Sequence, residues 1–179
     1  MQKVISVFGG SSPQPGEPAY EQARQVGRLL AEAGCAVATG GYSGTMSAVS
    51  QGAAEANGRV IGVTSAQIER FRPLGANPWV QEEIRYESLR ERLLHLVTQN
   101  DGMLVLPGGI GTLSEMTLAW SFLQVGEIAP RPLVLLGEQW RVTVASFVQP
   151  AYVRESHLHL LQFANTPEVA VRAVVQAVP

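Results

Sequence analysis

The sequence predicts a doubly wound α/β fold, in which helices cover both faces of a mainly parallel sheet. Short apolar runs alternate with longer segments of helical hydrophobic spacing along the chain, as βαβ units require. Glycine-bearing turns follow three of the apolar runs, where the carboxyl ends of parallel strands would meet. The 179 residues suffice for one domain with a substantial core, and no internal repeat or linker divides residues 1–179.

The elements follow in order from these patterns. Five apolar runs predict strands at 4–8, 35–39, 60–63, 103–106 and 132–136. Helical spacing predicts helices at 19–33, 45–56, 80–99 (with a break near 84–87), 113–125, 140–150 and 167–178. Residues 64–78 contain Pro73, Gly75 and Pro78 and are expected to form an irregular loop over the sheet edge or mouth, and 158–163 is a short apolar piece. A single Rossmann-like sheet of about five to seven strands accommodates these elements.

The turn from Pro107 to Thr112 is the strongest candidate for a ligand site. A buried strand ends there in Pro-Gly-Gly, and a helix begins directly afterwards, so backbone N–H groups and the helix dipole can face an anion. The same letters allow a plainer interpretation, because Thr112 and Glu115 have the spacing of a capping box. The lysine of a P-loop and the third glycine of a dinucleotide fingerprint are missing, so NAD binding, with Glu138 as its acid, is a weak alternative.

Composition excludes several classes of function. The net charge of −2 suggests neither a nucleic-acid partner nor an anionic membrane, and no apolar run is long enough to cross a membrane. The single Cys35 excludes a disulfide within the chain and is expected in the core. Because the sequence shows neither a signal peptide nor a membrane-crossing run, a cytoplasmic protein is expected. Lys3 is the only lysine and begins the first strand, which argues against a pyridoxal-phosphate Schiff base. His157 and His159 have no neighbouring cluster of ligands, so no metal site is predicted.

Few charged residues are expected near the glycine turns. Glu115 lies in the helix that follows the Pro107 turn, and the helix before that strand supplies Arg85, Arg90 and Arg92. His95 lies on the helix that carries Arg92, but a lone histidine is more often a packing or surface residue.

These motifs together resemble the Lonely Guy (LOG) family of cytokinin-activating nucleotide hydrolases, whose members are often labelled lysine decarboxylases. The motif Pro-Gly-Gly-x-Gly-Thr-x-x-Glu is intact as Pro107–Glu115, and 8–13 with 18–20 resemble the family's opening. Residues 40–46, Gly-Gly-Tyr-Ser-Gly-Thr-Met, have the form found in a branch that includes the molybdenum cofactor carrier proteins. The resemblance runs from Val7 to about Val125.

The resemblance implies a homodimer that hydrolyses a nucleoside 5′-monophosphate to free base and ribose 5-phosphate, without a metal or other cofactor. By the family's spacing Arg92 is its catalytic arginine, with Asp101 also matching, and Glu115 is the catalytic carboxylate. The implied phosphate cradle is Gly108, Gly109, Gly111 and Thr112. The rest of the implied nucleotide pocket is Gly9, Gly10, Ser11, Gly40, Gly41, Gly44 and Met46.

Two functions remain open on the sequence. The intact Arg92 and Glu115 favour a hydrolase. Leu93 stands where the family carries a lysine, which favours a non-catalytic protein that binds a nucleotide or a phosphate-bearing pterin, such as a molybdenum cofactor carrier.

Overall fold

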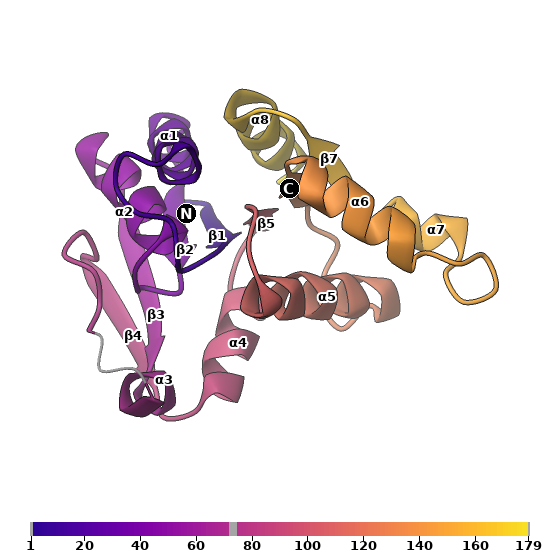
Figure 1. Ribbon diagram of the computed structural model, residues 1–179, viewed down its shortest axis with the longest axis horizontal. Helices are drawn as coiled ribbons and strands as arrows, with labels where there is room; N and C mark the ends of the chain where they lie inside the picture. Colours follow the sequence, from indigo (N-terminus) through magenta and orange to yellow (C-terminus); the bar gives the residue numbers. More distant parts are fainter. Residues whose placement is uncertain (1, 72–74, 179) are drawn as a thin grey trace.

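The computed structural model describes residues 2–71 and 75–178, and within these ranges seven strands form one parallel sheet (Figure 1). Across the sheet the order is β4-β3-β2-β1-β5-β6-β7. The strands are β1 (Val4–Phe8), β2 (Ala36–Thr39), β3 (Val60–Ser65), β4 (Glu82–Tyr86), β5 (Gly102–Val105), β6 (Leu133–Leu136) and β7 (Gln162–Ala164). The predicted α/β fold with a mainly parallel sheet is therefore confirmed.

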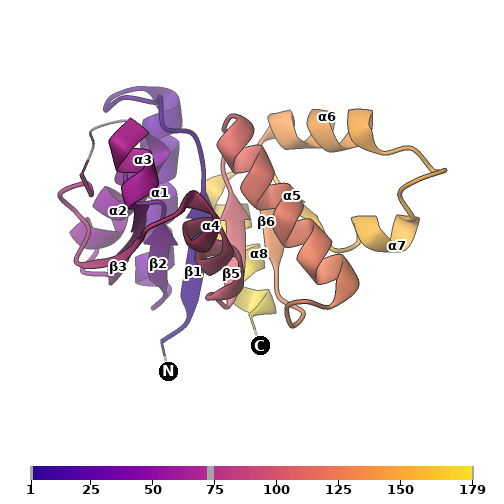
Figure 2. The same cartoon turned by 90° about the horizontal axis from the view of Figure 1, so that it is seen from below.

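Helices cover both faces of the sheet. Their bounds are α1 (Pro18–Glu32), α2 (Thr45–Glu55), α3 (Ala66–Phe71), α4 (Leu89–Thr98), α5 (Ile110–Val125), α6 (Glu138–Phe147), α7 (Glu155–Leu158) and α8 (Pro167–Ala177). One core cluster joins α1, α2 and α8 to the sheet, and a second joins α4, α5 and α6 to the opposite face. Figures 1 and 2 show this division, with α4 and α5 together on one side.

The central strands form because both of their faces are covered. All four residues of β2, β5 and β6 are buried, as continuous apolar runs in parallel sheets require. Cys35, at the start of β2, is also buried, in agreement with the prediction that it is a core residue.

The predicted helix over 80–99 is wrong in its first half. Residues Glu82–Tyr86 form the edge strand β4, which pairs with β3, and the helix α4 begins only at Leu89. Ser88 caps α4 in a capping box with Glu91. The exposed edge strand β4 has no continuous apolar run that would identify it as a strand. The helix predicted from the spacing of the leucines in α4 therefore extends too far toward the N-terminus. Arg85 consequently lies on a strand, and it pairs with Glu69.

The loop predicted over 64–78 also needs correction. Thr64 and Ser65 complete β3, and Ala66–Phe71 form the short helix α3, whose Ile68 N–H bonds to the Ser65 hydroxyl at 3.2 Å. Helix formation is possible because the proline and glycine residues of this segment all come later. Residues 72–74 of the predicted loop lie outside the described residues.

The sheet order creates a switch point between β1 and β5. From β1 the chain proceeds through β2, β3 and β4 toward one edge, and from β5 through β6 and β7 toward the other. Crevices at the carboxyl ends of strands next to such a reversal are the usual ligand sites of open α/β sheets. Within the described ranges, no helix combines the length and apolar character that a membrane crossing needs.

Candidate active site

A cavity of about 410 Å³ opens at the switch point. All three glycine turns contribute to its wall, which places the carboxyl ends of β1, β2 and β5 around one space, as the parallel sheet predicts. Helices α3, α4 and α5 complete the wall. Among the residues predicted for the site, those that line the cavity are Gly9, Gly10, Ser11, Gly40, Met46, Arg92, Gly109, Gly111, Thr112 and Glu115.

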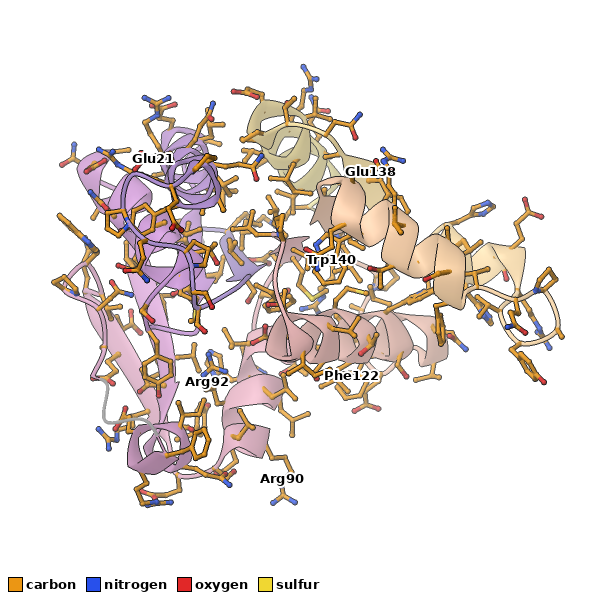
Figure 3. All side chains as sticks on the ribbon, viewed as in Figure 1. Glu21, Arg90, Arg92, Phe122, Glu138 and Trp140 are labelled. Carbon is orange, nitrogen blue, oxygen red and sulfur yellow. The ribbon has the colours of Figure 1, made fainter. Side chains whose placement is uncertain are left out.

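Arg92 reaches this cavity from α4 and is almost completely buried, with 6% of its surface exposed. Its Nε donates a hydrogen bond of 2.8 Å to the Val63 carbonyl on β3, and its guanidinium carbon lies 5.6 Å from the centre of the Tyr42 ring. Figure 3 shows Arg92 pointing into the interior, whereas Arg90 on the same helix points away. Burial lowers the pKa of Arg92, but nearby Glu115 favours its charged form.

Glu115 faces Arg92 from α5 and is 8% exposed. Its Oε1 lies 3.7 Å from Arg92 Nη1, which is an ion pair but too long for a hydrogen bond. Loss of water around the carboxylate raises the pKa of Glu115 to about 7, and the opposing effect of Arg92 is smaller. At neutral pH the cavity therefore holds a carboxyl group that exchanges readily between its neutral and ionised forms.

The Pro107–Thr112 turn presents backbone N–H groups at the start of α5. Helix α5 begins at Ile110, and Leu113 N–H makes the first helical bond, to the Gly109 carbonyl. The N–H groups of residues 110–112 precede that bond and have no partner within the helix. Gly109 and Gly111 have open space around them, so an anion can approach this backbone closely.

The capping-box interpretation of Thr112 and Glu115 is wrong. The N-cap of α5 is Gly109, and no side chain caps the helix. Thr112 and Glu115 instead lie inside the helix and are buried next to the cavity. Thr112 and Glu115 therefore share only the spacing of a capping box. If Thr112 were the N-cap, the helix would begin at Leu113, but α5 begins at Ile110, three residues earlier.

Three predicted residues lie beside the cavity without lining it. Gly108 belongs to the turn behind the cavity, where Gln139 bonds to both its N–H and its carbonyl, at 3.3 and 2.8 Å. The Gly41 carbonyl accepts hydrogen bonds from Asn77, and Gly44 packs against Gly10 and Ser11. Gly41 and Gly44 have positive φ angles of 77° and 71°, so these glycines shape the loop after β2.

Several cavity residues carry no recognisable signal in the sequence. Tyr42 lies within a glycine loop, yet its side chain is buried between Arg92 and Ser65. Ile68 and Phe71 belong to α3, in a segment that the sequence predicts as a loop. Leu89 and Ile110 begin α4 and α5. Only the three-dimensional arrangement shows that these side chains line the cavity.

The remaining charged candidates lie elsewhere. Arg90 is exposed, and His95 bonds through Nδ1 to the Tyr86 hydroxyl at 2.9 Å, which agrees with a packing role. Among residues 2–71 and 75–178, no group of three or more histidine, cysteine or acidic side chains is arranged to hold a metal ion. Lys3 precedes β1, at the end of that strand opposite the cavity.

The fold and the cavity together define an α/β protein in which an open glycine turn at a helix N-terminus lies in the same cavity as a buried arginine–glutamate pair. The family model described as "Possible lysine decarboxylase" matches residues 46–174, and the chain belongs to this family. The only lysine, Lys3, lies away from the cavity, so the site lacks the lysine that a pyridoxal-phosphate decarboxylase would need, despite the description of the family.

Named relatives agree with this assignment, and a solved structure shares the fold. The chain is 28% identical to the cytokinin riboside 5′-monophosphate phosphoribohydrolase of Mycobacterium tuberculosis, over 95% of this chain and 92% of that protein. It is also 28% identical to the probable cytokinin riboside 5′-monophosphate phosphoribohydrolase LOGL2 of Oryza sativa subsp. japonica, over 98% of this chain and 73% of that one. The molybdenum cofactor binding protein of Rippkaea orientalis has the same fold, with a TM-score of 0.78 and 24% identity over 100% of this chain and 99% of that chain.

Proposed function

We propose that this protein hydrolyses the N-glycosidic bond of a nucleoside 5′-monophosphate, of the AMP or cytokinin riboside type, to release free base and ribose 5-phosphate. The observation that carries the proposal is the buried pair of Arg92 and Glu115 in the same cavity as the open N-terminus of α5. The names of the relatives, which are phosphoribohydrolases, support the same reaction.

Each part of the site has a role in this proposal. The free backbone N–H groups at the Thr112 end of the Gly108–Thr112 turn hold the 5′-phosphate, together with the α5 dipole, while the N–H of Gly108 is held by Gln139. Arg92 adds its charge to the binding of the anionic substrate. Glu115, in its ionised form, faces the ribose ring, where positive charge develops as the glycosidic bond breaks.

The reaction needs no external reductant or oxidant. The bond between C1′ and the base nitrogen breaks, and its electron pair goes to that nitrogen, which takes up a proton. A water oxygen bonds to C1′ and loses a proton, so protons balance. A carboxylate in a cavity shielded from water stabilises such a transition state more strongly than it would in solution.

The test is release of adenine from AMP, measured by chromatography, with AMP binding measured by calorimetry. Glu115→Gln should lower kcat by about 100- to 1000-fold, while changing AMP affinity only a few-fold, because the lost charge acts on the transition state. Arg92→Ala should weaken both. Arg90→Ala, an exposed arginine on the same helix, is the matched control and should leave both unchanged. Unchanged turnover in Glu115→Gln would remove Glu115 from the mechanism.

One observation supports a second candidate function. Leu93 follows Arg92, where the resemblance leads us to expect a second cation, so the site has less positive charge to hold an anionic substrate. A protein that binds a nucleotide or a phosphate-bearing pterin without cleaving it, such as a molybdenum cofactor carrier, fits this difference. In that case wild-type protein will bind AMP or the pterin and release no base.

The proposal includes a homodimer, as the resemblance implies, and a cytoplasmic location. Exposed apolar side chains on the neighbouring helices α4 and α5 support self-association: Leu89, Leu94, Ile110 and Val125. Light scattering coupled to size-exclusion chromatography measures the oligomeric state directly, and a monomer at micromolar concentration would contradict this part of the proposal.

A further inference from the structure

We propose that the segment Gly40–Tyr42 is an arginine-positioning loop: Gly40 leaves the space that the Arg92 guanidinium occupies, and Tyr42 supports that guanidinium with its ring. Both act through Arg92, as positioning residues and not as contacts to the substrate. This inference has two tests. The measurement of kcat/KM rests on the function proposed above, whereas a crystal structure of Gly40→Ala tests the position of Arg92 without reference to that function.

The carboxylate of Glu115 does not fix the position of Arg92. The distance of 3.7 Å between them is beyond hydrogen-bond range, and the one hydrogen bond of the Arg92 side chain within the described residues goes from Nε to Val63. A single bond at Nε leaves the outer part of the guanidinium free to turn about the side-chain torsions. Other contacts must therefore fix the orientation of the planar Arg92 guanidinium.

Tyr42 supplies one of these contacts, and it is itself firmly held. Its hydroxyl accepts a hydrogen bond from Ser65 N–H at 2.8 Å and donates one to the Ser65 carbonyl at 3.2 Å. Its backbone carbonyl accepts a bond from Asn77 Nδ2 at 3.1 Å. With both ends of the residue fixed, the ring forms a rigid support 5.6 Å from the guanidinium carbon of Arg92, within the range of a cation–π contact.

Gly40 contributes in a different way: because it has no side chain, the Arg92 guanidinium can occupy the space beside its backbone. A Cβ at this position would overlap Arg92 Nη2 and press against the sulfur of Met46 at 2.6 Å. Its φ angle lies outside the left-handed region, so alanine fits the backbone there. The obstructing atoms are the ends of flexible side chains, so Gly40→Ala should push the guanidinium aside without unfolding the protein.

This arrangement leaves the outer N–H groups of Arg92 available to a ligand. A guanidinium has five N–H donors, and only the one on Nε makes a hydrogen bond within residues 2–71 and 75–178. A loop that aligns the group in advance avoids the cost of ordering it when the substrate binds. The glycine loop after β2 thus serves the site indirectly, through the orientation of Arg92.

The kinetic test is a double-mutant cycle on adenine release from AMP. Gly40→Ala and Tyr42→Leu should each lower kcat/KM by about tenfold or more in the wild type, but less than about twofold in an Arg92→Ala background, because their effect passes through Arg92. Tyr42→Phe keeps the ring but loses the hydroxyl bonds to Ser65, so its loss of kcat/KM should be smaller than that of Tyr42→Leu. Equal losses in both backgrounds would overturn the proposal.

Two matched controls separate positioning from loss of stability. Gly75→Ala changes a glycine with open space around it, and Tyr20→Leu removes a buried tyrosine outside the cavity. Both should leave kcat/KM within about twofold of wild type. If Gly40→Ala fails to fold, the Tyr42 pair of variants still completes the cycle.

A crystal structure of Gly40→Ala distinguishes failure of this inference from failure of the proposed function. If wild type releases no adenine, the hydrolase proposal fails, and the same cycle is measured on AMP affinity by calorimetry. Displacement of the Arg92 guanidinium by the methyl group that Gly40→Ala introduces supports the positioning loop regardless of activity. A guanidinium that stays in place in that variant overturns it.

Discussion

Substitution of Glu115 by glutamine should stabilise the protein at alkaline pH while removing base release. Burial raises the pKa of Glu115 from its usual 4.5 to about 7, so the fold favours the protonated carboxyl group. At about 1.4 kcal/mol for each tenfold change in proton affinity, keeping the ionised form in the fold costs about 3 kcal/mol. Glutamine has nearly the shape of the protonated side chain and never incurs this cost.

The direction of the pH dependence follows from the raised pKa. Below pH 4.5 the carboxyl is protonated in both folded and unfolded chains, so wild type and Glu115→Gln should be about equally stable. As pH rises toward 7 the unfolded chain releases this proton first, and wild type loses stability that the variant keeps. The free energies of unfolding should differ by almost nothing at about pH 4 and by about 3 kcal/mol in favour of the variant at about pH 8.

Urea unfolding followed by tryptophan fluorescence measures this difference at each pH. The matched control is Glu127→Gln, an exposed glutamate just beyond the end of α5, which should change stability by less than about 0.5 kcal/mol at either pH. A difference between wild type and Glu115→Gln that does not vary with pH, or a variant less stable than wild type at alkaline pH, would refute the reasoning from burial.

Three further outcomes are expected. Adenine release should fall about fivefold between about pH 7 and pH 6, because the ionised fraction of Glu115 falls with a pKa near 7, and a flat kcat profile over this range would contradict that role. Crystals soaked in phosphate or sulfate should hold an anion at the Gly108–Thr112 turn, and an anion bound only elsewhere would count against the turn. Purified protein should show no pyridoxal-phosphate absorbance and release no carbon dioxide from lysine, because Lys3 cannot reach the cavity; either signal would overturn this.

The central part of the sheet is predictable from the sequence because those strands are buried on both faces. β1, β2, β5 and β6 appear as short, mostly apolar runs followed by glycine or proline, which favour buried strands. The edge strand β4 escapes prediction for the opposite reason, since Glu82, Glu83 and Arg85 are exposed and carry charges that edge strands commonly use. A hydrophobic pattern therefore predicts strands that helices bury on both faces, but not an exposed edge strand such as β4.

The candidate site is predictable in its backbone and not in its side-chain contacts. Glycine turns at the carboxyl ends of parallel strands lie on the same side of the sheet, so their meeting around one cavity follows from the strand pattern, whereas the side chains that α3 adds to the wall do not. The pairing of Arg92 with Glu115 comes from a family resemblance, because no spacing rule connects residues on two different helices. The support of Arg92 by Tyr42 depends on three chain segments meeting, which no local pattern encodes.

The separation of Arg92 from Glu115 explains why both groups remain chemically available. A bidentate pair at hydrogen-bond distance would hold the pKa of the carboxylate low and occupy the donors of the arginine. Here Val63 and Tyr42 contact Arg92 instead, and the 3.7 Å gap leaves burial as the dominant influence on Glu115. The fold thus maintains a carboxylate that is costly to ionise next to a cation with free donors. A buried ion pair costs more than it returns unless its groups are well hydrogen-bonded, so this incompletely bonded pair in a cavity is an argument that the cavity binds a ligand.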